Sequence, residues 1–537
     1  MANNYVVTSP ESLAAKPPVS STGAVRKRGV QVEDLLRNPW ARIAIPSLSD
    51  LYFVAVIVWV CMSGGAAGWE SLLGDADIGW HIRTGEWILD HHAVPHEDLY
   101  SFSKAGAPWY AWEWGSDVIY ASLHRAAGLK GVVLLAGVLI GAFAWTLLRR
   151  MVGGGVHLFW AMVVSLVGVG GASLHFLARP HLFTMLFLSL AVWMIEIDRR
   201  QPSQQSAKRL WLLIPLTIVW TNLHGGFLAL IAVLGLTAVG TAIEAWMGRG
   251  DFRRAARYAA LAGACSLASF VNPYGYRLHM HVAEYLRSDW IRNTIQEFQS
   301  PAFRNENVLQ FEALMLVGLI AAGLMFSQRR IVEGLWIVYL AHMALGSARH
   351  IPIFVTVCAP SIAYEISCWW RRWSGEARKS SLAGIGNQMS RDLTPSFLRS
   401  SVWPFLLVGT LAAMGAPVKW PKDFPGLIFP VKIIHEHASE ILNTRVLTTD
   451  QWGDYLIYLN PHQKVYVDGR SDFYGAEIGN QYLRMTGGQW DWLQILEKNR
   501  FTAVLLPSEL PICQLLKVDR AWRIAADSGK TILLVRR

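Results

Sequence analysis

The sequence is poor in charge and in cysteine. Asp, Glu, Lys and Arg make up only 16% of its 537 residues, whereas 53% are hydrophobic and the mean hydropathy is +0.28. This balance excludes a single ordinary soluble domain. The five cysteines include no C-x-x-C pair, so they indicate neither a disulfide framework nor a zinc motif. The carboxy-terminal region has no Gly-rich phosphate loop, which argues against nucleotide binding there.

Long apolar segments and 25 tryptophans stand where a soluble protein would carry charge. A helix needs about 20 apolar residues to cross a bilayer, and tryptophan is enriched at membrane interfaces. We therefore predict a polytopic α-helical membrane protein with about eleven transmembrane helices, several of them short. The predicted spans cover residues 51–68, 130–148, 156–176, 180–197, 210–223, 225–246, 256–271, 307–327, 331–347, 350–370 and 401–416.

Positive charge is concentrated in the amino-terminal segment and in short loops. Residues 1–48 are predicted to be a disordered basic cytoplasmic tail, because they are rich in Ser, Pro, Lys and Arg and show no cleavable signal peptide. Spans that alternate from there place five basic loops on the cytoplasmic side, as the positive-inside rule requires. The net charge of +10 therefore indicates topology rather than nucleic-acid binding. The loop 69–129 and everything after residue 417 are then predicted to lie outside.

An acidic pair follows the first span directly, in Gly74-Asp-Ala-Asp-Ile-Gly-Trp-His81. Two carboxylates and an imidazole are costly to desolvate beside a membrane, so they favour a chemical role at the outer surface. The pattern predicts a helix over residues 77–90, with Asp77 and His81 on one face, and an interfacial helix over residues 112–127. As an alternative, the two acids only cap that first helix.

The other predicted outer loops are short and polar. They carry His175, Arg179-Pro-His181, Asn222-Leu-His224-Gly-Gly226, Asn272-Pro-Tyr-Gly275 and Arg349-His350. A transporter more often places its polar groups near the bilayer midplane, whereas here they gather at one surface. The arginines can also be interface anchors, and the Asn-Pro-Tyr-Gly segment is a good turn by composition.

These features resemble the GT-C superfamily of integral-membrane glycosyltransferases, which includes protein O-mannosyltransferases, the lipid A aminoarabinose transferase and the oligosaccharyltransferase catalytic subunit. The resemblance rests on Asp75-x-Asp-x-x-x-His81, its place after the first span, Arg179-Pro, Asn222-Leu-His-Gly-Gly226 and the outer carboxy-terminal region. It implies transfer of a sugar, usually with inversion, from a polyprenyl-phosphate donor to a lipid, glycan or protein acceptor. It also implies a bacterial inner membrane enzyme with its active site on the periplasmic side.

Roles for individual residues follow from that chemistry. Asp75 matches the first acid of the family pair and is predicted to take the proton of the acceptor hydroxyl. Asp77 and His81 are predicted to support it or to hold a divalent metal, Mg²⁺ or Mn²⁺. The growing charge on the lipid phosphate needs cations or hydrogen-bond donors, for which the candidates are Arg179, His181, Arg349 and His350. The candidates for contacts with the acceptor are Glu113, His224, Trp452 and Asp454.

Residues 420–537 alternate helix-like and strand-like segments, which predicts a small extracytoplasmic α/β domain with strands that include 445–449 and 464–468. Trp452-Gly-Asp454-Tyr455 is similar to the Trp-Trp-Asp-Tyr-Gly motif of oligosaccharyltransferases but has a single Trp. This departure argues against recognition of an asparagine sequon. Acceptor binding by Trp452 and Asp454 remains one interpretation, and a core Trp with a turn Asp is the other.

Two other functions stay open on the sequence. One is a lipid-linked sugar transporter or flippase, which would need polar groups through the depth of the bundle. The other is a non-catalytic scaffold subunit of an envelope complex, for or against which the sequence contains no argument. The sugar and the acceptor are not encoded in any recognisable pattern.

Overall fold

The computed structural model describes residues 39–62, 68–304, 306–414 and 420–537. Residues 46–537 form one compact unit, and the short helix α2 (Pro39–Ala44) belongs to a separate unit of residues 1–45. Most of the predicted basic tail lies outside the described residues, as does the end of the first predicted span. The domain boundaries therefore stay predictions.

Six helices in the described ranges are long and apolar enough to cross a membrane. They are α7 (Leu129–Gly153), α8 (Leu158–Ala172) with its 3-10 extension, α9 (His181–Arg200), α12 (Phe227–Trp246), α16 (Glu306–Ser327) and α18 (Ile351–Ser374). Beside them stand shorter helices, α3 (Leu48–Met62), α11 (Leu213–Thr221), α13 (Phe252–Ala268), α17 (Ile331–Gly346) and α20 (Trp403–Ala413). The chain is a multi-pass membrane protein, and the number of helices that cross stays a prediction.

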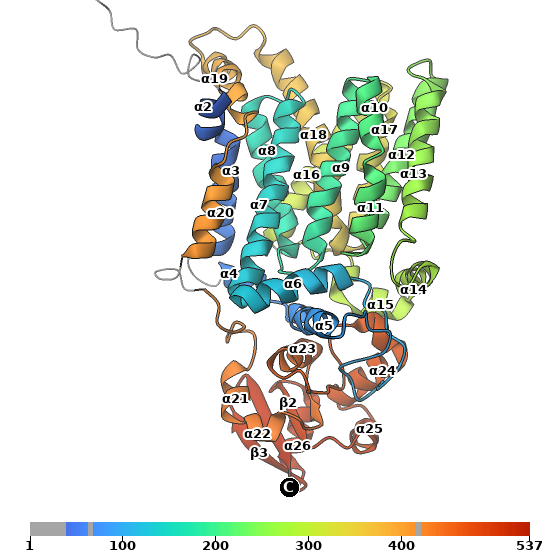
Figure 1. The fold of residues 1–537 in the computed structure, drawn as a ribbon, viewed down its shortest axis with the longest axis vertical. Coiled ribbons are helices and arrows are strands. Elements are labelled where there is room, and N and C mark those ends of the chain that lie inside the picture. Colours follow the sequence, from blue (N-terminus) through green and yellow to red (C-terminus); the bar gives the residue numbers. More distant parts are fainter. Residues whose placement is uncertain (1–38, 63–67, 305, 415–419) are drawn as a thin grey trace, which may run out of the picture. The chain divides into compact units, whose positions relative to one another are not determined.

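The long helices coincide with apolar segments, and α18 continues through Pro360. Figure 1 shows α5 (Asp77–His91), α6 (Trp114–Ala127) and α14 (Tyr276–Arg287) lying crosswise at one end of the bundle. The helices α10 (Gln204–Leu210) and α19 (Leu382–Phe397) lie at the other end. The predicted helices over residues 77–90 and 112–127 are confirmed as α5 and α6.

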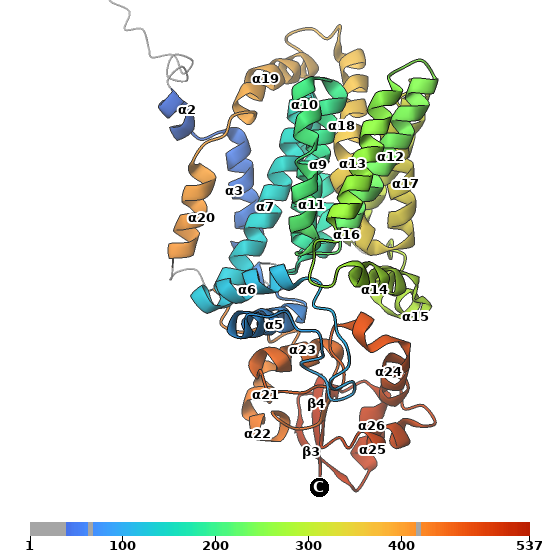
Figure 2. The same ribbon diagram turned by 45° about the vertical axis from the view of Figure 1, so that its right-hand side comes forward.

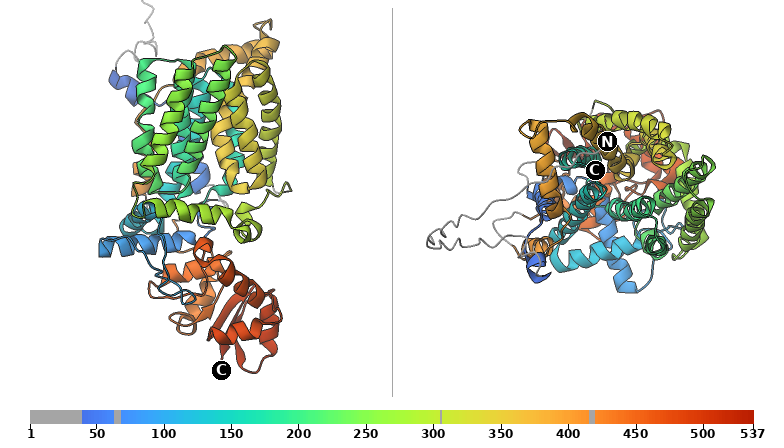
Figure 3. Two further views of the ribbon diagram at one scale, coloured as in Figure 1. Left: turned by 90° about the vertical axis from the view of Figure 1, so that its right-hand side faces the viewer. Right: turned by 90° about the horizontal axis from the view of Figure 1, so that it is seen from above.

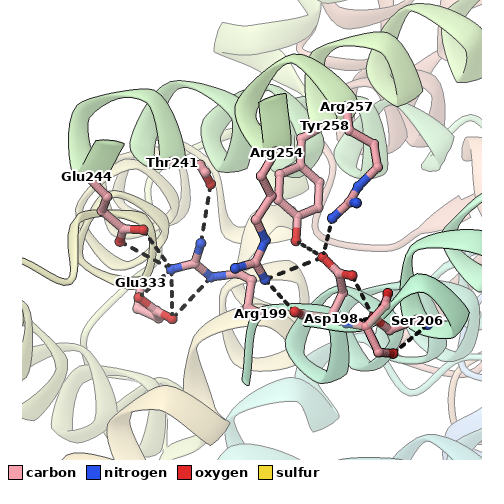
Figure 4. A network of polar contacts seen from close by, with 10 residues as sticks. Asp198, Arg199, Ser206, Thr241, Glu244, Arg254, Arg257, Tyr258 and Glu333 are labelled. Carbon is pink, nitrogen blue, oxygen red and sulfur yellow. Dashed lines mark hydrogen bonds and ion pairs between the residues drawn. The ribbon is translucent and has the colours of Figure 1, made fainter. Parts of the chain in front are cut away.

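A polar network holds the helices together at the α10 end (Figure 4). The buried carboxylate of Asp198 accepts hydrogen bonds from Ser206 (2.8 Å), Tyr258 (2.7 Å) and Arg257 (2.9 Å). Beside it, Arg199 pairs with carboxylates of α12 and α17 at 3.2 Å. Charges buried in this way need partners, so the network joins the ends of five helices, α9, α10, α12, α13 and α17, far from α5 and α6.

The carboxy-terminal region carries a four-stranded sheet, seen below the crosswise helices in Figure 2 and from another side in Figure 3. Its strand order is β1-β2-β4-β3, with β1 parallel to β2 and the other pairs antiparallel. The strands are β1 (Val446–Leu447), β2 (Ala503–Pro507), β3 (Trp522–Asp527) and β4 (Thr531–Arg536). Around them pack α21 (Val431–Glu436), α22 (Ala438–Ile441), α23 (Asp450–Leu459), α24 (Ser471–Thr486), α25 (Trp492–Lys498) and α26 (Pro511–Val518).

The prediction of a strand over residues 464–468 is wrong. This segment is extended, but it does not join the sheet, because its backbone pairs with the outer loop. The N–H of Val465 donates to the carbonyl of Tyr100 at 2.9 Å, and the N–H of Phe102 donates to the carbonyl of Val465 at 3.0 Å. The alternating apolar pattern therefore fits an extended segment whose partner lies more than 350 residues earlier in the chain.

The outer loop also packs directly on α23. A Cβ at Gly79 would lie 2.7 Å from the carbonyl oxygen of Asp454, so only glycine lets α5 approach this closely. Next to it, the N–H of Ala76 donates to the Gln451 side chain at 2.8 Å, and Arg83 Nε donates to the carbonyl of Tyr458 at 2.8 Å. These contacts set the acidic start of α5 against α23.

Candidate functional site

An open cavity of about 1570 Å³ lies where the crosswise helices, the ends of the membrane helices and the carboxy-terminal region meet. Its wall contains most of the site residues that the sequence predicted, although these come from segments up to 275 residues apart. The predicted residues that line it are Asp75, Asp77, Glu113, Arg179, His181, His224, Arg349 and His350. A single chamber thus collects polar residues from separate loops at the same end of the bundle.

Arg179 binds both acids of the pair that follows α3. Its Nη1 lies 2.7 Å from Asp75 Oδ2, and its Nη2 lies 2.6 Å from Asp77 Oδ2. The segment before it is anchored, because the N–H of Ala178 donates to the carbonyl of Leu72 at 2.8 Å. A guanidinium fork suits two carboxylates at once, so this cation fixes the direction in which both acids point.

Asp77 has a second acidic neighbour, Asp454 of α23. The N–H of Gly469 donates to both oxygens of Asp454 at 3.0 and 3.1 Å, and a Cβ at Gly469 would lie 2.0 Å from Asp77 Oδ1 and 2.9 Å from Asp454 Oδ2. Burial raises the pKa of Asp77 well above its usual value, against the opposing effect of Arg179. Burial and the charge of Asp77 raise the pKa of Asp454 as well. Close carboxylates in a dry site hold a proton in this way.

Glu113 stands between two imidazoles. His81 Nε2 lies 3.6 Å from Glu113 Oε2, and His224 Nε2 lies 3.4 Å from Glu113 Oε1. Behind His81, its Nδ1 contacts Asp117 Oδ1 at 2.6 Å. Behind His224, its Nδ1 contacts the Thr184 hydroxyl at 2.8 Å. The result is one continuous row of polar groups from α6 to α9.

Burial sets the protonation of this row. It raises the pKa of Glu113 to about 8, although Arg179 and Arg349 act in the opposite direction. It lowers the pKa values of His81 and His224 well below the usual value for histidine. At neutral pH, both imidazoles are therefore neutral and Glu113 holds a proton.

Arg349 lies on another wall of the cavity and is also paired. Its guanidinium donates to the Tyr285 hydroxyl at 3.0 Å and lies 3.4 Å from Glu297 Oε1. Burial would raise the pKa of Glu297, but Arg349 and Arg179 outweigh it and leave that pKa at about 2. His181 Nε2 contacts the carbonyl of His175 at 2.5 Å. The predicted phosphate contacts thus share the chamber with acids that partly neutralise them.

Three predicted residues stand outside the cavity wall. The Trp452 indole is buried and donates to the carbonyl of Ile428 at 3.3 Å, and the fully buried Asp454 faces Asp77. The Thr449 side chain caps α23 and so turns Trp452 inward. His81 stands behind Glu113 rather than in the wall. The structure therefore favours the core interpretation of Trp452.

The predicted metal pair finds no third ligand. Within the described ranges, no group of three or more His, Cys, Asp or Glu side chains is placed to hold a metal ion. Arg179 occupies the position between the two acids that a bridging cation would take. A metal held by Asp77 and His81 stays a prediction.

Several residues of the site escaped the sequence analysis. Asp117 looked like a polar interruption of an interfacial helix, although its place four residues after Glu113 puts both on one face of α6. Glu297 and Asp472 also line the cavity but lie in segments without a recognisable motif. Nothing in the sequence distinguishes Thr184 from other polar residues of membrane helices, and only the structure shows that it contacts His224.

No family model matches the sequence, and no curated protein matches it at a significant level. Solved structures do match its fold. The oligosaccharyltransferase of Archaeoglobus fulgidus in the apo form aligns with a TM-score of 0.54 and 12% identity over 86% of this chain and 69% of its own. The same organism's oligosaccharyltransferase AglB, in complex with an inhibitory peptide and a dolichol-phosphate, aligns at 0.53 and 11% over 87% and 70%. ArnT from Cupriavidus metallidurans aligns at 0.46 and 12% over 90% and 97%. The chain therefore shares the fold of the Archaeoglobus oligosaccharyltransferase, which agrees with the GT-C-like architecture that its motifs predicted.

Proposed function

We propose that the chain is a membrane glycosyltransferase that moves a sugar from a polyprenyl-phosphate donor to an extracytoplasmic acceptor. The observation that carries this proposal is the two-sided character of the cavity. One part of its wall is charged and faces the carboxy-terminal region, whereas another part is apolar and comes from membrane helices. A chamber of this kind suits an amphiphile whose polar head reacts while its chain stays among the helices.

The apolar part is built by α12, α16 and α17. Leu228, Ala232, Val308, Leu340 and Met343 line it. Because these side chains belong to helices of the membrane bundle, a prenyl chain can enter the cavity without leaving an apolar environment. The related fold of the Archaeoglobus oligosaccharyltransferase binds a dolichol-phosphate, which supports the same class of donor here.

In the proposed reaction, Asp75 is the general base. The acceptor hydroxyl forms a bond to the anomeric carbon as its proton passes to Asp75, and the bond from that carbon to the phosphate oxygen breaks. One base and direct displacement give inversion. Arg179 orients Asp75, and Asp77 with Asp454 holds Arg179 from the other side.

The remaining contacts divide between donor and acceptor. Arg349, His350 and His181 lie near the ends of membrane helices and are proposed to contact the donor phosphate. Glu113 and His224 are within the same chamber. In line with the positive-inside rule at the α10 and α19 end, the cavity and the carboxy-terminal region are proposed to lie in the periplasm of a bacterial inner membrane.

The test is sugar transfer by membrane vesicles that contain the full chain and receive radiolabelled polyprenyl-phosphate hexoses and pentoses. Asp75→Asn is expected to abolish transfer without loss of folded protein. Asp90→Asn is the matched control, because Asp90 is exposed on α5 and, among the described residues, pairs only with exposed Arg125. Full transfer by Asp75→Asn would contradict the mechanism. Uptake of the lipid-linked sugar without any covalent transfer would contradict the function.

A further inference from the structure

The row of groups around Glu113 has a fixed arrangement of protons. The backbone N–H of Gly226 donates to His224 Nδ1 at 2.9 Å, and the Thr184 hydroxyl lies 2.8 Å from the same nitrogen. Thr184 accepts from the Trp220 indole at 2.8 Å, so its own proton is free to go to His224. A neutral imidazole with Nδ1 as acceptor carries its proton on Nε2, which faces Glu113.

The other side of Glu113 is arranged in the same way. His81 Nδ1 is 2.6 Å from Asp117 Oδ1, and burial together with the charge of Glu113 raises the pKa of Asp117 well above its usual value. With the proton of this contact assigned to Asp117, the His81 proton lies on Nε2. This Nε2 is buried and, among the described residues, has no hydrogen-bond partner, although Glu113 lies 3.6 Å away. Two N–H groups therefore point at one carboxyl group.

Two arginines of the cavity wall already have acidic partners. Arg179 is bound by Asp75 and Asp77, and Arg349 pairs with Glu297. When the sugar leaves, the lipid phosphate changes from a diester with one negative charge to a monoester that tends toward two. A second charge among so many carboxylates is costly, and a proton removes it.

We propose that Glu113 is the general acid that protonates the departing lipid phosphate. This inference rests on the proposed function and adds a second catalytic residue to it. The bond between the anomeric carbon and the phosphate oxygen breaks, the electron pair stays on that oxygen, and the Glu113 proton passes to the phosphate. The acceptor proton passes to Asp75 in the same step, so the site gains and loses no net charge.

The two imidazoles stabilise what this step produces. Their Nε2 atoms lie 3.4 and 3.6 Å from Glu113, longer than ordinary hydrogen bonds, while the acid is protonated. When Glu113 becomes a carboxylate, both N–H groups form charge-assisted bonds to it. His81 and His224 thus favour the transition state over the ground state as positioning residues.

The test measures release of polyprenyl phosphate from a polyprenyl-phosphate hexose by membrane vesicles that contain the full chain and the native acceptors, across a pH series. Glu113→Gln is expected to lower the rate about 10²- to 10⁴-fold with an unchanged KM for the donor. The wild-type rate is expected to fall as pH rises through about 8, and Glu113→Gln removes that limb. The groups that act on Glu113 in this titration are His81, Asp117, Arg179, His224, Glu297, Arg349 and Asp472.

Infrared difference spectra of wild type against Glu113→Gln add a readout that needs no turnover. They are expected to show a protonated carboxylic acid at pH 7 that disappears above about pH 8. Gly226→Ala tests the histidine, because its Cβ would lie 2.2 Å from Thr184 Oγ1 and displace the hydroxyl from His224. Gly235→Ala on α12 is the matched control, since its Cβ meets no atom within 4 Å.

Each outcome bears on the inference. A shift of the basic limb in Gly226→Ala, but not in Gly235→Ala, supports it. An active wild type whose Glu113→Gln variant keeps the rate and the limb overturns this inference alone. A wild type that releases no lipid phosphate from any hexose or pentose donor overturns the proposed function, and the inference with it.

Discussion

The substitution Gly469→Ala is expected to disable the site, although Gly469 carries no reactive group. The added Cβ would lie 2.0 Å from Asp77 Oδ1, whereas real Cβ contacts essentially never fall below 3.0 Å, so the carboxylate must move by at least about 1 Å. It cannot simply move toward α23, since the same Cβ lies 2.9 Å from Asp454 Oδ2. The 2.6 Å ion pair between Asp77 and Arg179 is therefore lost or distorted.

Because Arg179 also binds Asp75, the displacement reaches the proposed base. A misplacement of about 1 Å commonly costs about 10²-fold in rate. We expect Gly469→Ala to lower polyprenyl phosphate release by about that factor at saturating donor, measured by mass spectrometry on membrane vesicles that contain the full chain and the native acceptors. Gly426→Ala, whose Cβ meets no atom within 4 Å, serves as the control. A Gly469→Ala protein with the wild-type melting temperature and the wild-type rate would refute the reasoning.

Three further predictions concern protons, packing and metal. The pKa values of Asp77 and Asp454 are raised in the folded protein, so these two groups stabilise it most at low pH, and their contribution declines as the pH rises through those values. Asp454→Asn is therefore expected to reduce the fall in melting temperature with rising pH. Asp198→Asn, at the far end of the bundle, is expected to lower the free energy of unfolding by about 3 kcal/mol in a thermal melt. Lys432→Gln on the surface is expected to leave the melting temperature unchanged. Equal melting temperatures for the two variants would contradict this. Since Arg179 already bridges the acid pair, EDTA is expected to leave lipid phosphate release intact, and a loss that Mn²⁺ restores would show otherwise.

Much of the fold could be predicted from the sequence, because long apolar segments and basic loops are local signals. The helices over residues 77–90 and 112–127 also follow from local periodicity and are present as α5 and α6. The strand over residues 464–468 failed for the opposite reason. Alternation shows that a segment is extended, but it does not show whether a sheet or a distant loop supplies its partner, and here the partner is Tyr100.

The candidate site could be predicted as a set of residues but not as a set of contacts. Asp75 and Arg179 were expected at the same membrane surface, yet their 2.7 Å ion pair joins residues 104 positions apart and leaves no trace in either motif. The row that ends in Asp117 and Thr184 depends on how α6, α9 and the loop before α12 pack. Trp452 shows the converse. The resemblance of its motif suggested a contact with the acceptor, but its side chain lies in the core.

The most direct measurement is a cryo-EM structure of the full chain in nanodiscs with polyprenyl phosphate. The account predicts a phosphate in the cavity close to Arg349, with Asp75 and Glu113 facing the side where the sugar would stand. It predicts the prenyl chain between α12, α16 and α17. Lipid phosphate bound elsewhere, with the cavity empty at saturating lipid, would contradict the account.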